Sequence, residues 1–140
     1  MIHPFSERTA GVGGVTYGLS PAGYDIRIAG PVDMSKYGAR EFVLASSIER
    51  FDIPDDVIGI VHDKSTFARL GLAVQNTVIE PGWRGHLTLE LSYHGNDRLV
   101  IDAGTGIAQV IFHRLEAPTD QPYAGRYQDQ EAGPVAAKIG

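Results

Sequence analysis

Glycine and proline interrupt this chain so often that mainly short elements fit between them. The 140 residues include 17 glycines and 8 prolines, and the segments between them alternate apolar and polar residues, as half-buried strands do. Residues 87–93 alternate most clearly, with the leucines on one face and Thr88, Glu90 and Ser92 on the other. Many short strands separated by turns are typical of an all-β sandwich or distorted barrel, which is the fold class we predict.

The remaining elements are predicted from the same patterns. Further strands are expected at residues 24–28, 41–45, 57–62, 72–75, 98–101 and 107–115. Residues 93–97 are expected to form a polar hairpin turn. One short helix is predicted over residues 65–70, with Ser65 as its N-cap and Gly71 just after its end.

The length and hydrophobic content fit one domain. Hydrophobic residues make up 43% of the chain, which is enough to build a single core at this size. We predict one β domain over residues 1–117, in which residues 1–20 are a loop-rich lead-in, followed by a tail over residues 118–140. The composition of the tail favours a structureless segment; the alternative is a segment that closes over a ligand.

Cysteine and charge exclude several classes of function. The chain has no cysteine, which rules out disulfides, thiolate nucleophiles, iron–sulfur clusters and cysteine-ligated zinc. The net charge of −5 argues against a nucleic-acid coat, although a local basic cluster could still hold a small anion. The five histidines lack metal-ligand spacing. Without a secretory signal or a long apolar run, we expect a cytoplasmic protein with no membrane or nucleic-acid partner.

A first polar cluster surrounds the predicted helical turn. Lys64, Ser65, Thr66 and Arg69 place two cations and two hydroxyls there. The start of a helix attracts anions, so these residues could bind a phosphate. The alternative is an ordinary capped turn with solvated charges.

Two further clusters could bind the remainder of a ligand. Glu80 and Trp83 flank a Pro-Gly turn, an arrangement that suits a sugar hydroxyl and a ring, unless it is only a surface turn with a half-buried tryptophan. Glu90 lies mid-strand, where partial burial would raise its pKa and suit it to general-base catalysis, unless that strand face is solvated. In the tail, Tyr123, Arg126, Tyr127 and Gln130 could close over an aromatic, anionic ligand.

Taken in order, these motifs resemble the dCTP deaminase family, which belongs with dUTPase in one trimeric β-fold superfamily. The motifs are Ala22-Gly23-Tyr24-Asp25-Ile26-Arg27, Lys64-Ser65-Thr66-x-x-Arg69-Leu70-Gly71-Leu72, Ile79-Glu80-Pro81-Gly82-Trp83-Arg84-Gly85, Leu89-Glu90 and Arg126-Tyr127-x-x-Gln130. The resemblance implies a dUTPase-like homotrimer with active sites between subunits. It implies a hydrolase that converts dCTP to dUTP and ammonia without zinc, with Mg²⁺ accompanying the triphosphate and dUTP or dTTP as further ligands.

The resemblance also implies a role for each matching residue. Glu90 corresponds to the catalytic glutamate, a general base and proton shuttle, and Ser65 and Arg69 correspond to residues that place the water, the ligand and that glutamate. The segment from Lys64 through Thr66 to Arg69 corresponds to the phosphate-binding segment. Glu80 would contact the deoxyribose 3′-hydroxyl. The other implied substrate-binding residues are Trp83, Thr88 and Leu89 around the base, and Tyr123, Arg126, Tyr127 and Gln130 in the closing tail.

Two other functions stay open. One is dUTPase activity, alone or combined with deamination to give dUMP and diphosphate; the other is a non-catalytic nucleotide-binding module. The tail lacks the glycine-rich motif with Phe, Ser and Thr that a dUTPase would carry, which favours the deaminase. The chain departs from better-known deaminases in a shorter segment at residues 73–79, which lacks the usual Thr-Ala pair, and in Glu80 where Asp is usual.

Overall fold

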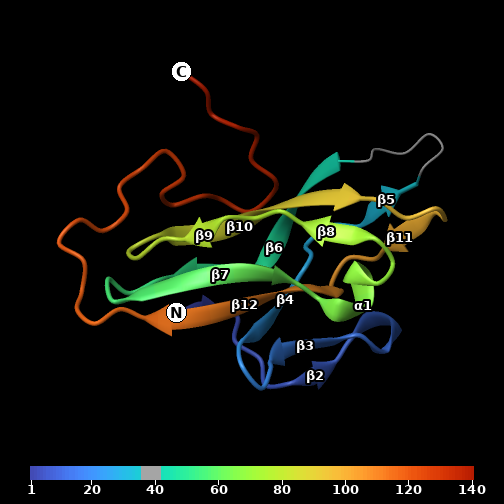
Figure 1. Ribbon diagram of the computed structural model, residues 1–140, viewed down its shortest axis with the longest axis horizontal. Coiled ribbons are helices and arrows are strands. Elements are labelled where there is room, and N and C mark those ends of the chain that lie inside the picture. Colours follow the sequence, from blue (N-terminus) through green and yellow to red (C-terminus); the bar gives the residue numbers. More distant parts are fainter. Residues whose placement is uncertain (36–41) are drawn as a thin grey trace.

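The computed structural model describes residues 1–35 and 42–140, and these residues form a mainly β structure (Figure 1). The helical elements are η1 (Val12–Gly14) and α1 (Ser65–Ala68). The strands are β1 (Ile2–His3), β2 (Thr9–Ala10), β3 (Thr16–Leu19), β4 (Tyr24–Arg27), β5 (Val32–Met34), β6 (Phe42–Asp52), β7 (Val57–Asp63), β8 (Leu72–Val74), β9 (Val78–Ile79), β10 (Arg84–Tyr93), β11 (Leu99–Ile101) and β12 (Gly106–Arg114). The predicted all-β class with a short helix is confirmed.

The strands form two larger sheets and a separate pair. One sheet has the order β1-β6-β10-β8, the other has the order β2-β3-β4-β12-β7-β9, and β5 pairs with β11. All of these strand pairings are antiparallel. Figure 1 shows the layer of β6 and β10 above the layer of β7 and β12. The fold is therefore a sandwich with β10 paired on both sides.

Alternation along β10 divides this strand between the core and the surface. Leu89 and Leu91 are 0% exposed and pack in the core, together with Ile26 and Ile107 from the facing sheet. The intervening Glu90 is only half-buried. Because successive side chains of a strand point to opposite faces, burial of the leucines directs Glu90 away from the core.

A buried ion pair joins the two sheets. The Glu49 side chain on β6 is 0% exposed, and its Oε1 accepts a 2.8 Å hydrogen bond from Arg27 Nε on β4. Its Oε2 accepts a 2.9 Å bond from the Arg27 backbone N–H. The Arg27 guanidinium also lies 4.4 Å from the centre of the Tyr17 ring. A buried carboxylate requires such partners, since an unpaired one would lose several kcal/mol of solvation.

Most of the predicted strands are confirmed with small changes of boundary. Residues 24–28, 57–62, 72–75, 98–101 and 107–115 correspond to β4, β7, β8, β11 and β12, and residues 87–93 lie within β10. Residue 41 of the predicted strand 41–45 lies outside the described residues, and the rest begins the longer β6. The alternation fails along β6 because the charged Glu49 faces inward. The short strands β1, β2, β3, β5 and β9 were not predicted.

Three local predictions are wrong. Lys64, not Ser65, is the N-cap of α1, without a side-chain capping bond, and the helix ends at Ala68. Residues 93–97 do not form a hairpin, because β10 pairs with β6 and β8 whereas β11 pairs with β5. The tail is not structureless: its residues hydrogen-bond to β10, as described below. Gly71 does adopt a left-handed φ of +99°.

We expect Leu89→Ala to lower the free energy of unfolding by about 2–5 kcal/mol, because it leaves a cavity beneath the centre of β10. Urea unfolding followed by far-UV circular dichroism measures this change. The control is Val100→Ala, since Val100 is 52% exposed and its truncation should change stability by less than about 0.5 kcal/mol. Equal effects of the two substitutions would contradict the placement of Leu89.

Candidate active site

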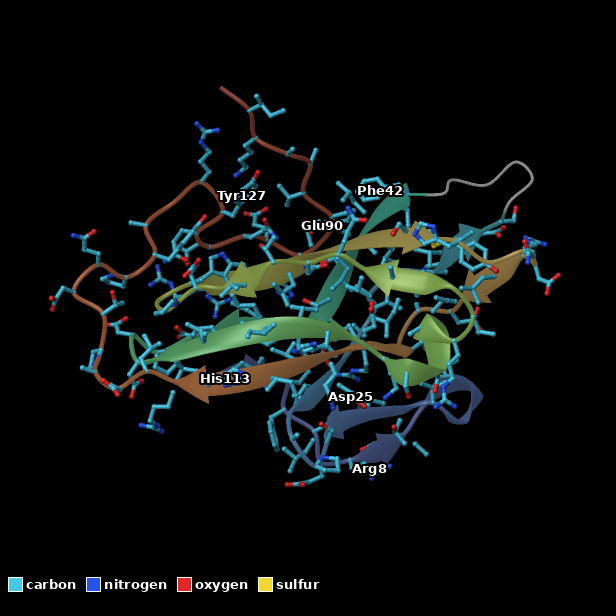
Figure 2. The ribbon with its side chains drawn as sticks, viewed as in Figure 1. Arg8, Asp25, Phe42, Glu90, His113 and Tyr127 are labelled. Carbon is cyan, nitrogen blue, oxygen red and sulfur yellow. The ribbon has the colours of Figure 1, made fainter. Side chains whose placement is uncertain are left out.

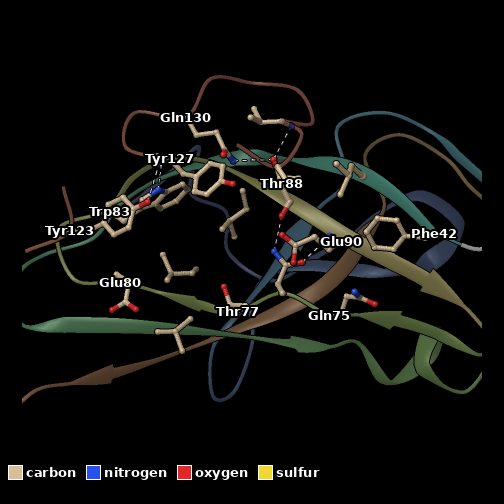
Figure 3. Close-up of a pocket in the computed structure, with 17 residues that line it drawn as sticks. Phe42, Gln75, Thr77, Glu80, Trp83, Thr88, Glu90, Tyr123, Tyr127 and Gln130 are labelled. Carbon is tan, nitrogen blue, oxygen red and sulfur yellow. Dashed lines mark hydrogen bonds between the residues drawn. The ribbon is translucent and has the colours of Figure 1, made fainter. Parts of the chain in front are cut away.

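A cleft of about 570 Å³ lies over the outer face of β10, between the loop that follows β8 and the C-terminal tail (Figure 3). This size is in the range of small-molecule sites. The cleft brings together many of the predicted site residues. Those that line it are Glu80, Trp83, Thr88, Glu90, Tyr123, Tyr127 and Gln130.

Glu90 is the half-buried carboxyl group of this cleft. Desolvation by burial raises the pKa of its side chain above the ordinary value. Its backbone is fixed on the side of β10 away from β6: the N–H donates to Asn76 Oδ1 at 2.9 Å, and the C=O accepts from the Gln75 N–H at 2.9 Å. The raised pKa expected from its position in the strand is confirmed, and it favours proton exchange closer to neutral pH.

The Pro-Gly turn forms one wall of the cleft. Gly82 has a φ of +80°, the left-handed conformation that glycine adopts in such a tight turn. The turn is closed by a 3.1 Å hydrogen bond from the Trp83 N–H to the Glu80 carbonyl. Trp83 is only 6% exposed, and its indole N–H donates to the Tyr127 carbonyl at 2.7 Å. The tryptophan is therefore a buried wall that also anchors the tail, while Glu80 is exposed at the rim.

The tail forms the opposite wall because β10 holds it in place. Gln130 Nε2 donates to the His86 carbonyl at 2.7 Å and to Thr88 Oγ1 at 3.0 Å. The Val135 N–H also donates to Thr88 Oγ1, at 3.0 Å. Figure 3 shows Gln130 and Tyr127 above the strand, facing the cleft. The tail residue Arg126 lies outside this lining, and its guanidinium donates to the Lys138 carbonyl at 2.6 Å.

The predicted phosphate-binding segment does not line this cleft within one chain. Lys64, Ser65 and Thr66 line a second hollow together with Asp25. The Lys64 ammonium forms an ion pair there with Asp25, so its charge is already compensated. Figure 2 shows Asp25 on the far side of β7 from Glu90. The structure of one chain therefore separates Ser65 from Glu90.

Two other predicted residues are placed differently from the expectation. Arg69 is exposed just after α1 and lines neither hollow. The Leu89 side chain is fully buried on the core face of β10, so it does not reach the cleft. Leu89 is absent from the residues that line the cleft, so the structure of one chain does not bring it to the predicted base-binding position.

Sequence reasoning missed several cleft residues, chiefly Phe42 and Asn76. Phe42 begins β6 and is 47% exposed. Asn76 lies in the loop between β8 and β9, where no periodicity marks it. The only sequence signal for Asn76 was an amide side chain in a short segment between two strands. The sequence alone does not show which groups that amide would bond.

Across residues 1–35 and 42–140, no group of three or more metal-binding side chains converges. Over the same ranges, no helix has the length and hydrophobicity needed to cross a membrane.

The structure is similar to those of dUTPases, so the chain has a dUTPase-like all-β fold. The dUTPase of EIAV has a similar structure, with a TM-score of 0.62, 18% identity, and coverage of 89% of this chain and 97% of that chain. A mutant dUTPase from phage phi11 of S. aureus has a TM-score of 0.63 at 16% identity, covering 90% and 97%. That dUTPase coordinates a structural Mg(II) ion. At such identities the likeness establishes the fold.

Sequence comparison places the chain within that class. The family model for dCTP deaminase-like domains matches residues 37–115. The dCTP deaminase of Campylobacter fetus subsp. fetus is 39% identical over 160 residues, covering 94% of this chain and 86% of that protein. The dCTP deaminase of Acidobacterium capsulatum is 36% identical over 168 residues, covering 99% and 91%. The chain belongs to the dCTP deaminase family.

We expect Gln130→Ala to loosen the tail, because it removes both side-chain bonds to β10. Trypsin should then cleave faster after the exposed Arg126, while the urea midpoint changes little. The matched control is Gln121→Ala, an exposed glutamine in the same tail. Cleavage at the wild-type rate in Gln130→Ala would show that these bonds do not hold the tail.

Proposed function

We propose that this chain is a dCTP deaminase, a hydrolase that converts dCTP and water to dUTP and ammonia without zinc. One observation carries the proposal: a half-buried glutamate with a raised pKa lies in an aromatic-walled cleft of a chain that is 39% identical to a dCTP deaminase. The absence of cysteine removes the usual ligands of zinc-dependent base deaminases.

Glu90 is proposed to move the protons of this reaction. Its carboxylate takes a proton from water as the water oxygen bonds to C4 of cytosine, and that proton is delivered to N3. The second proton of the water then passes through Glu90 to the exocyclic nitrogen. The C4–N4 bond breaks, ammonia leaves and the C4 carbonyl of uracil forms. A carboxyl group with a raised pKa can both accept and return a proton near neutral pH.

The cleft provides suitable surroundings for the nucleoside. Trp83, Tyr123 and Tyr127 supply aromatic wall, and Thr88 and Gln130 supply polar groups near the base. Glu80 at the rim is proposed to accept the 3′-hydroxyl hydrogen bond. Mg²⁺ is proposed to enter with the triphosphate as part of the substrate.

The residues that bind the triphosphate are proposed to come from a neighbouring copy of the chain in a homotrimer. Lys64, Ser65, Thr66 and Arg69 are exposed or line a different hollow from Glu90. A site that uses both groups would therefore need two chains. Arg126, in the tail 118–140 that closes over the nucleotide, is proposed to add a further cation. The bacterial dCTP deaminases among its relatives favour a cytoplasmic enzyme.

A second activity is supported by one feature of the cleft. Glu80 supplies a second carboxylate, which could orient a water for hydrolysis of dUTP to dUMP and diphosphate, and the similar solved structures are dUTPases. A bifunctional deaminase and dUTPase is therefore the second candidate, and dUTP and dTTP are further ligands to test. A non-catalytic nucleotide-binding module would show binding without turnover.

We expect the purified protein with Mg²⁺ to convert dCTP to dUTP and ammonia, and chromatography of the nucleotides resolves the products. Incubations with dCMP and dUTP belong to the same experiment. Formation of dUMP from dCTP and dUTP would identify the bifunctional enzyme. Unchanged dCTP beside rapid dUTP hydrolysis would overturn the deaminase proposal, and binding with no turnover would identify the non-catalytic module.

We expect Glu90→Gln to lower kcat for dCTP by about 100-fold to 10,000-fold, because an amide cannot shuttle protons. Binding of dCTP, measured by calorimetry, should change little because the side chains are nearly isosteric. The matched control is Glu116→Gln, an exposed glutamate after β12, which should retain wild-type kcat. Wild-type turnover by Glu90→Gln would exclude Glu90 as the proton shuttle.

A further inference from the structure

Pairing between β8 and β10 ends next to the part of β10 whose side chains line the cleft. The last register pair between the two strands is Val74 with Leu91, and the Gln75 N–H still donates to the Glu90 carbonyl. Beyond this point, β8 supplies no backbone partner for the Glu90 N–H or the Thr88 carbonyl. Polar backbone groups in a partly buried position require other partners.

The side chain of Asn76 supplies those partners. Its Nδ2 donates to the Thr88 carbonyl at 2.7 Å, and its Oδ1 accepts from the Glu90 N–H at 2.9 Å. A primary amide can donate and accept at once, as a peptide unit of a neighbouring strand does. The partners also fix its orientation, because the reverse would place the NH₂ group against the Glu90 N–H. The Asn76 side chain therefore continues the hydrogen-bond ladder between β8 and β10 by two bonds.

The two backbone groups that Asn76 holds belong to residues with side chains on the same face. Thr88 and Glu90 are two positions apart on one strand, and both line the cleft. Figure 3 shows the dashed contacts from the loop to the backbone of this strand, beneath the Glu90 side chain. Movement of this segment would therefore displace the carboxyl group and the Thr88 hydroxyl together.

We propose that Asn76 is a positioning residue for Glu90: its amide fixes the backbone that carries the carboxyl group in the cleft. The catalytic part of this inference rests on the proposed deaminase function. Both polar atoms of Asn76 bond to the backbone of β10, so we assign its effect to the position of Glu90. Its loss should affect the chemical step more than nucleotide binding, since a displacement of about 1 Å can cost about 100-fold in rate.

The test compares two variants with the wild-type protein. Asn76→Leu is similar in size and removes both hydrogen bonds. Asn76→Asp keeps an acceptor for the Glu90 N–H and loses the donor to the Thr88 carbonyl, and it serves also if the leucine variant fails to fold. Gln130→Ala is the comparator, because it weakens the tail and leaves the Asn76 contacts in place.

The first measurement is amide hydrogen exchange, which requires no activity. In Asn76→Leu the Glu90 amide should exchange about tenfold faster, the effect of losing a bond of about 1.4 kcal/mol. The amides of Leu89 and Leu91, which point toward β6 by alternation, should be unchanged. Asn76→Asp should keep the Glu90 amide protected. Unchanged exchange at Glu90 in Asn76→Leu, or loss of its protection in Asn76→Asp, would overturn the proposed contact.

The second measurement is steady-state deamination of dCTP. Asn76→Leu should lower kcat by about 100-fold with little change in KM, whereas Gln130→Ala should mainly raise KM. A wild-type kcat in Asn76→Leu, or a change confined to KM, would overturn the positioning role. An inactive wild-type protein would instead overturn the deaminase proposal, and the exchange measurement would still decide whether Asn76 holds the backbone of Glu90.

Discussion

The alternation of side chains along β10 determines both the core and the cleft. Its pairing with β6 has a bulge between His86 and Thr88 and then keeps one register from Thr88 to Ser92, which sets the direction of every side chain in that segment. A shift by one residue would bury Glu90 and expose Leu89, which is 0% exposed. Hydrophobic burial of the leucines therefore fixes the direction of the carboxyl group. The same strand register stabilises the core and directs Glu90 into the cleft.

Charge in this acidic chain is arranged in local pairs rather than in one basic surface. The Arg27–Glu49 pair joins the sheets, and the Lys64–Asp25 pair lies in the second hollow. These cations are already compensated. Arg69, by contrast, makes no ion pair within the described parts of the chain. Within one chain, a polyanionic ligand would thus depend on the few cations that are not already compensated.

Sequence periodicity predicted the strands with one apolar face and failed where a polar group is buried or a partner is remote. The pattern of 87–93 placed Glu90 on the face opposite the leucines, but only the structure shows that this face lines a cleft. The predicted strand 41–45 stopped short of the end of β6 because Glu49 faces inward to pair with Arg27. The tail was misjudged because composition carries no record of the bonds from Gln130 to β10, more than forty positions away. Such contacts depend on the folded sheet and cannot be read from local pattern.

The short loop after β8 still provides hydrogen-bond partners for the edge of β10 next to it. A longer segment could continue the ladder with its own peptide groups, whereas here β8 ends at Val74 and β9 begins at Val78. The amide of Asn76 replaces one peptide unit of such a ladder, with both of its polar atoms bonded to β10. Because only the side-chain amides of Asn and Gln carry a neutral donor and a neutral acceptor side by side, the two backbone groups of β10 restrict which residue at position 76 can make both bonds.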